Sequence, residues 1–214
     1  MADVYNLVDY DSEEERERDP QGPPRANLFA AAIYLKTLWD ANNIAFAALG
    51  GFAMMCRGSE RQTRDIDLVV QTNMATLWAL ITPQPRLIIP NTRLLDGVIK
   101  RIEVDLMTPG FKGTPMQVSQ NRDNLSVHIS GQGLIFPCLS ILYMMQTKLN
   151  ACAERGAPRD FEDVQHLLVT YPGEIAGIRN RLNPIMVDGF LESIRVNFDL
   201  NQQSIADCHR VLGR

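Results

Sequence analysis

The chain has 214 residues, of which 45% are hydrophobic and 21% charged, and its formal net charge is -4. These fractions are typical of an ordinary globular domain with an apolar core, and the acidic balance argues against broad, nonspecific binding to nucleic acid. No stretch has the composition of a membrane-spanning helix, and the first residues are too acidic for a signal or transit peptide. The four cysteines lack the spacing of a zinc site or a disulfide framework, so we expect reduced thiols and a cytoplasmic protein.

The segment 1–24 is predicted to be a disordered acidic tail. Acidic residues dominate it between Asp9 and Asp19, and prolines follow. Such a composition cannot bury enough apolar surface to order the backbone. We therefore expect an α/β core over 25–136, where helical and strand patterns mix, and a helical subdomain over 137–214.

Hydrophobic periodicity predicts alternating helices and strands in the core. The expected helices are Asn27–Asn42, Phe52–Arg57 and a helix capped by Asn73 that runs to Ile81. The expected strands are Ile44–Leu49, Asp65–Val70, Arg86–Ile89, Lys100–Met107, Leu125–Ile129 and Leu134–Phe136. Because Asp-Gly favours a tight two-residue turn, Asp96-Gly97 predicts a hairpin whose second arm is the strand ending at Met107. The stretch Thr108–Gln120 is rich in Gly and Pro and is expected to be a loop.

After Pro137 the pattern becomes helical. The expected helices are Leu139–Arg155, Arg159–Val169, Glu174–Leu182, Val187–Asp199 and Gln203–Leu212. The chain is therefore predicted to be an α+β protein, with a sheet flanked by helices followed by a helical bundle.

The strand Asp65–Val70 and the residues before it carry the chemistry. Polar side chains alternate there, at Arg61, Thr63, Asp65 and Asp67. Alternate residues of a strand share a face, and two carboxylates that lie close repel unless a cation or proton intervenes. This favours a divalent metal site, with Mg²⁺ as the expected ion because it takes hard oxygen ligands. Asp-x-Asp by itself is common in turns and caps, so the flanking pattern decides the interpretation.

That flanking pattern is Gly50-Gly51, then Gly58, then Arg-x-Thr-x-Asp-Ile-Asp-Leu from Arg61. It resembles the minimal nucleotidyltransferases of the polymerase-β-like superfamily. The resemblance implies a mixed sheet of nucleotidyltransferase type, a glycine turn that opens a short helix, and a following strand with metal-binding aspartates. In this chain the glycine turn is Gly50-Gly51 and the aspartates are Asp65 and Asp67.

A third acid is expected on a neighbouring strand. In Ile102-Glu103-Val104-Asp105-Leu106 the two acids share one face. Asp105 lies in Val-Asp-Leu-Met-Thr-Pro, which resembles the third-carboxylate strand of the same superfamily, whereas Glu103 has no such match. We expect Asp105 to complete the metal ligands with Asp65 and Asp67. For Glu103 a half-exposed strand position remains an equal alternative.

The helical half contains Lys148, then Arg155-Gly156, Arg159-Asp160 and Asp163. This order resembles the nucleotidyltransferase toxins of abortive-infection toxin–antitoxin systems, in which a helix lysine and an aspartate opening the next helix belong to the active site. Carried over, these residues are Lys148 and Asp160. The alternatives are a surface lysine packed along its stem and an aspartate that caps the helix beginning near Phe161.

The catalytic residues implied are Asp65, Asp67, Asp105, Lys148 and Asp160. The residues expected to bind substrate are Gly50, Gly51, Arg61, Thr63, Arg64, Arg155 and Arg159. The predicted reaction is the Mg²⁺-dependent transfer of NMP from an NTP such as ATP to a hydroxyl of a protein, a small molecule or tRNA. No membrane is expected among the partners. Two alternatives remain open: a tRNA-dependent reaction on the same fold, such as synthesis of arginine-containing cyclodipeptides, and a non-catalytic nucleotide- or tRNA-binding module. Neither a P-loop nor a dinucleotide-binding fingerprint occurs.

Overall fold

The structure is a computed structural model that describes residues 22–87, 96–99, 102–129, 132–197 and 202–214. The chain divides into two compact units. The sheet unit contains the chain up to Phe111 together with Met116–Cys138, and the helical unit contains Lys112–Pro115 and Leu139–Arg214. Each unit is described by itself below.

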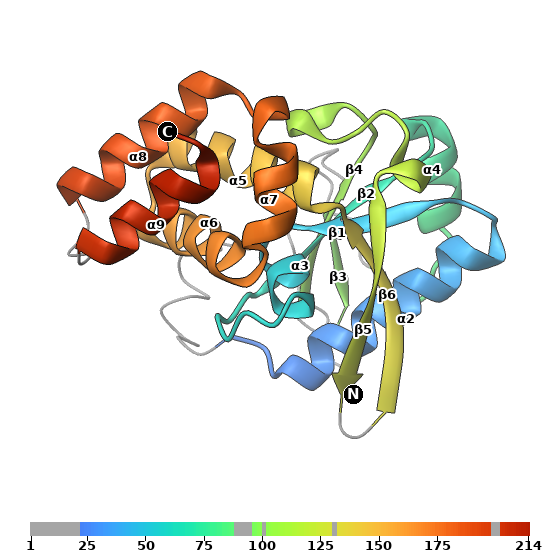
Figure 1. Cartoon of the computed structure of the whole chain (residues 1–214). Helices are drawn as coiled ribbons and strands as arrows, with labels where there is room; N and C mark the ends of the chain where they lie inside the picture. Colours follow the sequence, from blue (N-terminus) through green and yellow to red (C-terminus); the bar gives the residue numbers. More distant parts are fainter. Residues whose placement is uncertain (1–21, 88–95, 100–101, 130–131, 198–201) are drawn as a thin grey trace. The chain divides into compact units, whose positions relative to one another are not determined.

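Six strands of the described residues form one sheet in the order β3-β4-β2-β1-β6-β5 (Figure 1). They are β1 (Phe46–Leu49), β2 (Asp65–Val70), β3 (Asp96–Ile99), β4 (Ile102–Met107), β5 (Arg122–Ile129) and β6 (Gln132–Leu139). Strand β1 runs antiparallel to β2 and parallel to β6, whereas β2 is parallel to β4 and β3 is antiparallel to β4. The sheet is therefore mixed, and with the helices it confirms the predicted α+β class.

The helices of the sheet unit are α2 (Arg25–Ala41), α3 (Gly50–Cys56) and α4 (Met74–Ile81). Helix α4 begins as predicted, because the Asn73 side chain accepts a hydrogen bond from the Thr76 amide at 2.9 Å. Aromatic rings from α2, α3, β1 and β6 meet in the core: Phe136 lies 5.4 Å from Phe52 and 5.7 Å from Phe46 between ring centroids. All residues of β1 are buried, so this strand is the centre of the unit.

The helical unit contains α5 (Ile141–Arg155), α6 (Pro158–Thr170), α7 (Pro172–Ile178), α8 (Pro184–Asn197) and α9 (Gln202–Leu212). Helix α5 packs on α6 and α8, and α9 packs on α7 and α8. Helix α5 ends at Gly156, whose left-handed backbone (φ 63°) suits a glycine after a helix. The chain re-enters α6 at Pro158, a favoured residue for the first turn because its missing N–H has no helical partner there.

Several predicted boundaries differ from the structure. Asp96 and Gly97 lie inside β3 and not in a turn, because β3 pairs with β4 from Ile99 opposite Ile102 back to Asp96 opposite Asp105. The local turn signal is weaker than the pairing of a whole strand, so the prediction of the turn was wrong although the two strands are antiparallel neighbours. Arg86 and Leu87 are outside any strand, and the remainder of the predicted strand lies outside the described residues.

Helix α3 begins at Gly50, two residues before the predicted start, so the glycine pair forms its first turn. Strand β6 continues through Pro137 to Leu139, beyond the predicted end. The predicted acidic tail falls almost entirely on residues 1–21, which lie outside the described residues. Among the helices that the structure describes, none is long and apolar enough to cross a membrane.

Candidate functional site

Four acidic side chains lie on one face of two neighbouring parallel strands. The register of β2 and β4 sets Asp65 opposite Glu103 and Asp67 opposite Asp105. Residues two apart on a strand point to the same side, and residues paired across strands do so as well. All four positions are half-buried, whereas the intervening residues Ile66 and Val104 are buried. The predicted pairing of Asp67 with an acid on a neighbouring strand is therefore present in the register.

Gly50 packs directly against the Asp67 carboxylate. Its φ of +62° lies in the left-handed region that L side chains rarely adopt. A Cβ atom at this position would overlap with the carboxylate and lie 2.7 Å from its carboxyl carbon. Only glycine fits both the backbone conformation and the space, so the turn and the aspartate form one local unit.

Gly51 makes a second close approach to different side chains. A Cβ atom there would lie 2.7 Å from a terminal nitrogen of Arg61 and 2.7 Å from Cβ of Thr63. Thr63 is buried, and its hydroxyl donates a hydrogen bond to Oδ1 of Asp65. The start of α3 therefore lies beside the Arg61 guanidinium, Thr63 and the Asp67 carboxylate.

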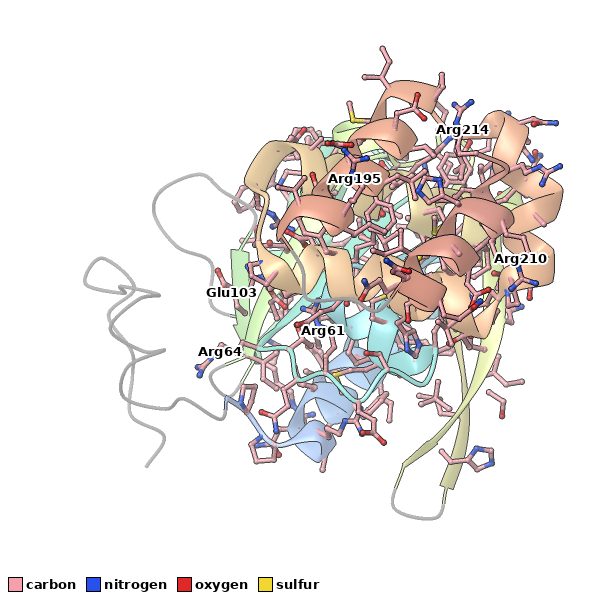
Figure 2. The ribbon with its side chains drawn as sticks, turned by 60° about the vertical axis from the view of Figure 1, so that its left-hand side comes forward. Arg61, Arg64, Glu103, Arg195, Arg210 and Arg214 are labelled. Carbon is pink, nitrogen blue, oxygen red and sulfur yellow. The ribbon has the colours of Figure 1, made fainter. Side chains whose placement is uncertain are left out.

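Arg64 is placed differently from Arg61. Its Cγ packs 3.0 Å from the position that a Cβ atom of Gly22 would occupy. In Figure 2 the labelled side chain of Arg64 points away from that of Arg61. Of the two arginines predicted to bind substrate near this strand, the one that lies at the glycine pair is Arg61.

The carboxylates of β2 and β4 supply the hard oxygen donors that Mg²⁺ prefers. As the described side chains stand, no group of three or more His, Cys, Asp or Glu residues is gathered closely enough to hold a metal ion. A magnesium site does not require such a group, because Mg²⁺ is usually held by one or two carboxylates while waters and substrate phosphates complete its shell. The donor chemistry therefore fits Mg²⁺ at Asp65 and Asp67, and the metal site itself stays a prediction.

In the helical unit, Lys148 and Asp160 each have an oppositely charged partner. Lys148 Nζ lies 2.7 Å from Oδ2 of Asp163, and the side chains are 6% and 1% exposed. Arg155 donates to both oxygens of Asp160, at 2.7 and 3.2 Å, and Asp160 is also 1% exposed. Arg159 is exposed. Each buried acid therefore has a basic partner between α5 and α6.

These placements exclude the two structural alternatives, a surface lysine for Lys148 and a helix cap for Asp160. Lys148 is not a surface lysine, because the residue is only 5% exposed. Asp160 does not cap α6: the helix begins at Pro158, and the cap residue Ala157 makes no side-chain hydrogen bond. The partner of Lys148 is Asp163, which was not among the residues predicted to form the site. The spacing of three residues places Asp160 and Asp163 on one face of the same helix, but it does not indicate which of them pairs with Lys148.

The four cysteines are free and buried, which agrees with the prediction of unpaired thiols. Cys152 lies near the ion pairs of α5 and α6. Burial, followed by the negative charge of Asp160, raises the pKa of the Cys152 thiol from 9.0 to about 12. Burial also raises the pKa of Cys138 and of Cys208. None of these three thiols is poised as a nucleophile, because the reactive form is the thiolate.

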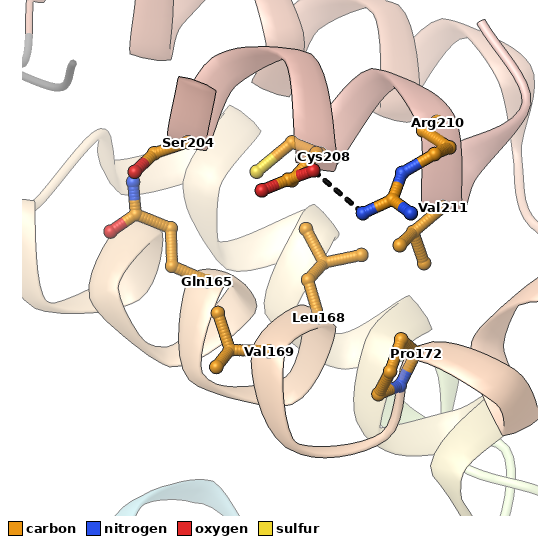
Figure 3. A pocket seen from close by; sticks show the side chains of 9 residues that line it. Gln165, Leu168, Val169, Pro172, Ser204, Cys208, Arg210 and Val211 are labelled. Carbon is orange, nitrogen blue, oxygen red and sulfur yellow. Dashed lines mark hydrogen bonds and ion pairs between the residues drawn. The ribbon is translucent and has the colours of Figure 1, made fainter. Parts of the chain in front are cut away.

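The helical unit also has a pocket of about 300 Å³ between α6, α7 and α9 (Figure 3). Its lining residues are Gln165, Leu168, Val169, Pro172, Ser204, Asp207, Cys208, Arg210 and Val211. The charged side chains at its edge, Asp207 and Arg210, form an ion pair at 2.6 Å. None of the predicted site residues lines this pocket.

Comparison by sequence gives no relatives: no family model matches the chain, and no curated protein does. Comparison of structures gives several. An antigenic nucleotidyltransferase-like protein from Paracoccidioides brasiliensis is similar with a TM-score of 0.59 at 17% identity, covering 89% of this chain and 98% of that chain. The complex of ANT(2'')-Ia with adenylyl-2''-tobramycin is similar with a TM-score of 0.48 at 14% identity, over 71% of this chain and 98% of that chain.

The likeness to the Paracoccidioides protein extends over most of both chains and establishes the architecture. The resemblance to toxins of abortive-infection systems stays a prediction. The chain has a nucleotidyltransferase-like fold, as the residues from Gly50 to Val70 predict.

Proposed function

We propose that the protein is a Mg²⁺-dependent nucleotidyltransferase that transfers NMP from an NTP to a hydroxyl acceptor. The observation that carries the proposal is the close approach of Gly50 to Asp67, with Asp105 in register on β4. This turn brings the backbone directly against the Asp67 carboxylate and the guanidinium of Arg61, so that ligands for a cation and a positive charge for a phosphate lie close together. This is the arrangement that phosphoryl transfer requires, because most of its catalysis is positioning and charge neutralisation.

In this proposal Asp65 and Asp67 bind the cation, and Asp105 accepts the proton of the attacking hydroxyl. Magnesium, when bound, neutralises the phosphate charge and aligns the α-phosphorus. The acceptor oxygen forms a bond to the α-phosphorus while the bond from that phosphorus to the pyrophosphate oxygen breaks. Arg61, which lies at Gly51, supplies a positive charge and several N–H donors for the phosphates.

Lys148 and Asp160 have a different place in the proposal. Both are already neutralised by partners inside the helical unit, Asp163 and Arg155. A buried lysine that pairs with an aspartate has little charge left to offer a phosphate. We therefore assign the chemistry to the carboxylates of the sheet unit, and we keep Lys148 and Asp160 as residues whose substitution is expected to affect folding first.

The test is label transfer from each of the four α-³²P-labelled NTPs to cell extract, purified tRNA or the protein itself, with Mg²⁺ and with EDTA. The wild type is expected to label an acceptor when Mg²⁺ is present and to label none when EDTA is present. The double variant D65N/D67N is expected to lose at least about 1,000-fold in rate, because removing the ligands removes several kcal/mol of transition-state stabilisation. Asp40→Asn is a matched control, since Asp40 is an exposed acid of α2 that pairs with Lys36.

Full activity of D65N/D67N would refute the assignment of the site. The same preparations incubated with aminoacylated tRNA and no NTP test the tRNA-dependent alternative. Release of a dipeptide product in that reaction, without labelling from any NTP, would replace the proposed reaction. Binding of NTP or tRNA by the wild type without any turnover would favour the non-catalytic module.

A further inference from the structure

Thr63 is a polar residue whose hydroxyl faces the protein and not the solvent. It is 7% exposed and lies two residues before the first residue of the strand that carries the two aspartates. Its Oγ1 donates to Oδ1 of Asp65. A side chain this deeply buried is poorly placed to contact a nucleotide, so its contact with Asp65 is a better guide to its role than the direct substrate contact that the sequence predicted.

The glycine pair supports this contact. A Cβ atom at residue 51 would overlap with the Thr63 hydroxyl and lie 2.7 Å from Cβ of Thr63. Any other residue at this position would push Thr63 away from α3 and from Asp65. Gly50 has the corresponding relation to Asp67. The two glycines therefore serve different aspartates: Gly50 gives room to the carboxylate of Asp67, and Gly51 gives room to the residue that holds Asp65.

We propose that Thr63 is a positioning residue that orients the Asp65 carboxylate for cation binding, and that Gly51 is needed to let it do so. The torsion that turns a carboxylate is broad and has no strong preferred value. A donor on Oδ1 fixes the carboxylate plane and leaves Oδ2 able to accept a cation. Partners of this kind behind a metal ligand change metal affinity about 10- to 100-fold. This inference rests on the proposed function only in taking Asp65 as a cation ligand.

The test measures Mn²⁺ binding by electron paramagnetic resonance, with and without a non-hydrolysable ATP analogue. Thr63→Val keeps the shape and removes the hydroxyl, and Thr63→Ala removes it without adding a methyl group. Both are expected to weaken Mn²⁺ binding by about tenfold or more. Thr63→Ser keeps the hydroxyl and is expected to stay within about twofold of the wild type by the same measure.

Thr37→Val is the matched control, because the Thr37 hydroxyl donates only to the Ile33 carbonyl within α2 in the described contacts, at 2.9 Å. Circular dichroism melting of every variant separates loss of fold from loss of affinity. Rescue by Thr63→Ser alone supports the positioning role, since a purely steric role would also be kept by valine. Equal Mn²⁺ affinity in Thr63→Val and wild type overturns the inference, as does the absence of Mn²⁺ binding by the wild type in both conditions.

This test also separates the inference from the proposed function. A wild-type protein that binds Mn²⁺ in a Thr63-dependent manner but transfers no nucleotide would refute the nucleotidyltransferase assignment and leave the role of Thr63 standing. If the wild type transfers nucleotide but Thr63→Val and Thr63→Ala bind Mn²⁺ as tightly as the wild type does, the nucleotidyltransferase assignment stands and the role of Thr63 is refuted.

Discussion

The sheet unit and the helical unit both contain pairs of aspartates close in sequence, but the two pairs differ in burial. Asp65 and Asp67 are half-buried on a sheet face, where Gly50 leaves room for the carboxylate of Asp67. Asp160 and Asp163 are each 1% exposed and paired with Arg155 and Lys148. Spacing of acids alone does not separate these cases.

The difference lies in how far each charge is removed from water. A buried carboxylate needs its counter-charge inside the protein, because desolvation costs several kcal/mol. A half-buried carboxylate keeps contact with water and can therefore also bind a cation from solution. We therefore expect the helical pairs to join α5 to α6, whereas the acids of the sheet unit stay half-buried and accessible to a ligand.

The largest effect on stability is expected from Asp163→Asn. This substitution leaves the Lys148 charge buried without its acid, and such losses cost about 3–5 kcal/mol. Urea denaturation followed by circular dichroism measures the change. The double variant K148M/D163L, which replaces the pair by apolar side chains, is expected to recover most of the loss. A cost below about 1 kcal/mol for Asp163→Asn would remove the contrast between the two units.

A smaller but more local effect is expected from Gly50→Ala. Left-handed backbone costs a non-glycine residue about 1–2 kcal/mol, and the overlap with Asp67 adds to this. Gly58→Ala is the matched control, because Gly58 has a φ of +85° but nothing within 4 Å of its Cβ position. Urea denaturation gives the loss in free energy of unfolding for each variant, and the difference between the two losses measures the contact with Asp67. Equal losses would mean that the glycine serves the turn alone and not the aspartate.

The effect that is smallest at neutral pH concerns Cys152, because it develops only in alkaline solution. The pKa of this thiol is raised to about 12 in the folded protein, whereas the unfolded thiol ionises near 9.0. Unfolding therefore releases a proton between these values, so the free energy of unfolding is expected to fall as pH rises from about 9 toward 12. In Cys152→Ala this fall should be less steep. The measurement compares the slope of the free energy of unfolding against pH in the wild type and in the variant. Identical slopes would show that Asp160 and burial do not hold the thiol protonated.

Much of the architecture was predictable because it depends on local periodicity. The Asn73 cap, the strand Asp65–Val70 and all five C-terminal helices follow from patterns within a few residues. The turn at Asp96-Gly97 was wrong because the position of a hairpin turn is decided by which strands pair over their length. The partners of Lys148 and Asp160 were not predictable, since charge pairing between helices depends on how their faces meet.

The sequence by itself determined the fold class and the chemistry available: a glycine pair, two aspartates on alternating positions and a third acid two residues from a fourth. Only the tertiary structure decided which of these groups meet. The parallel register of β2 and β4 brings Asp67 opposite Asp105, and the start of α3 brings each glycine against a different side chain. Burial made the final distinction, because a charge removed from water must find its partner within the protein, and one left at the surface can bind a ligand.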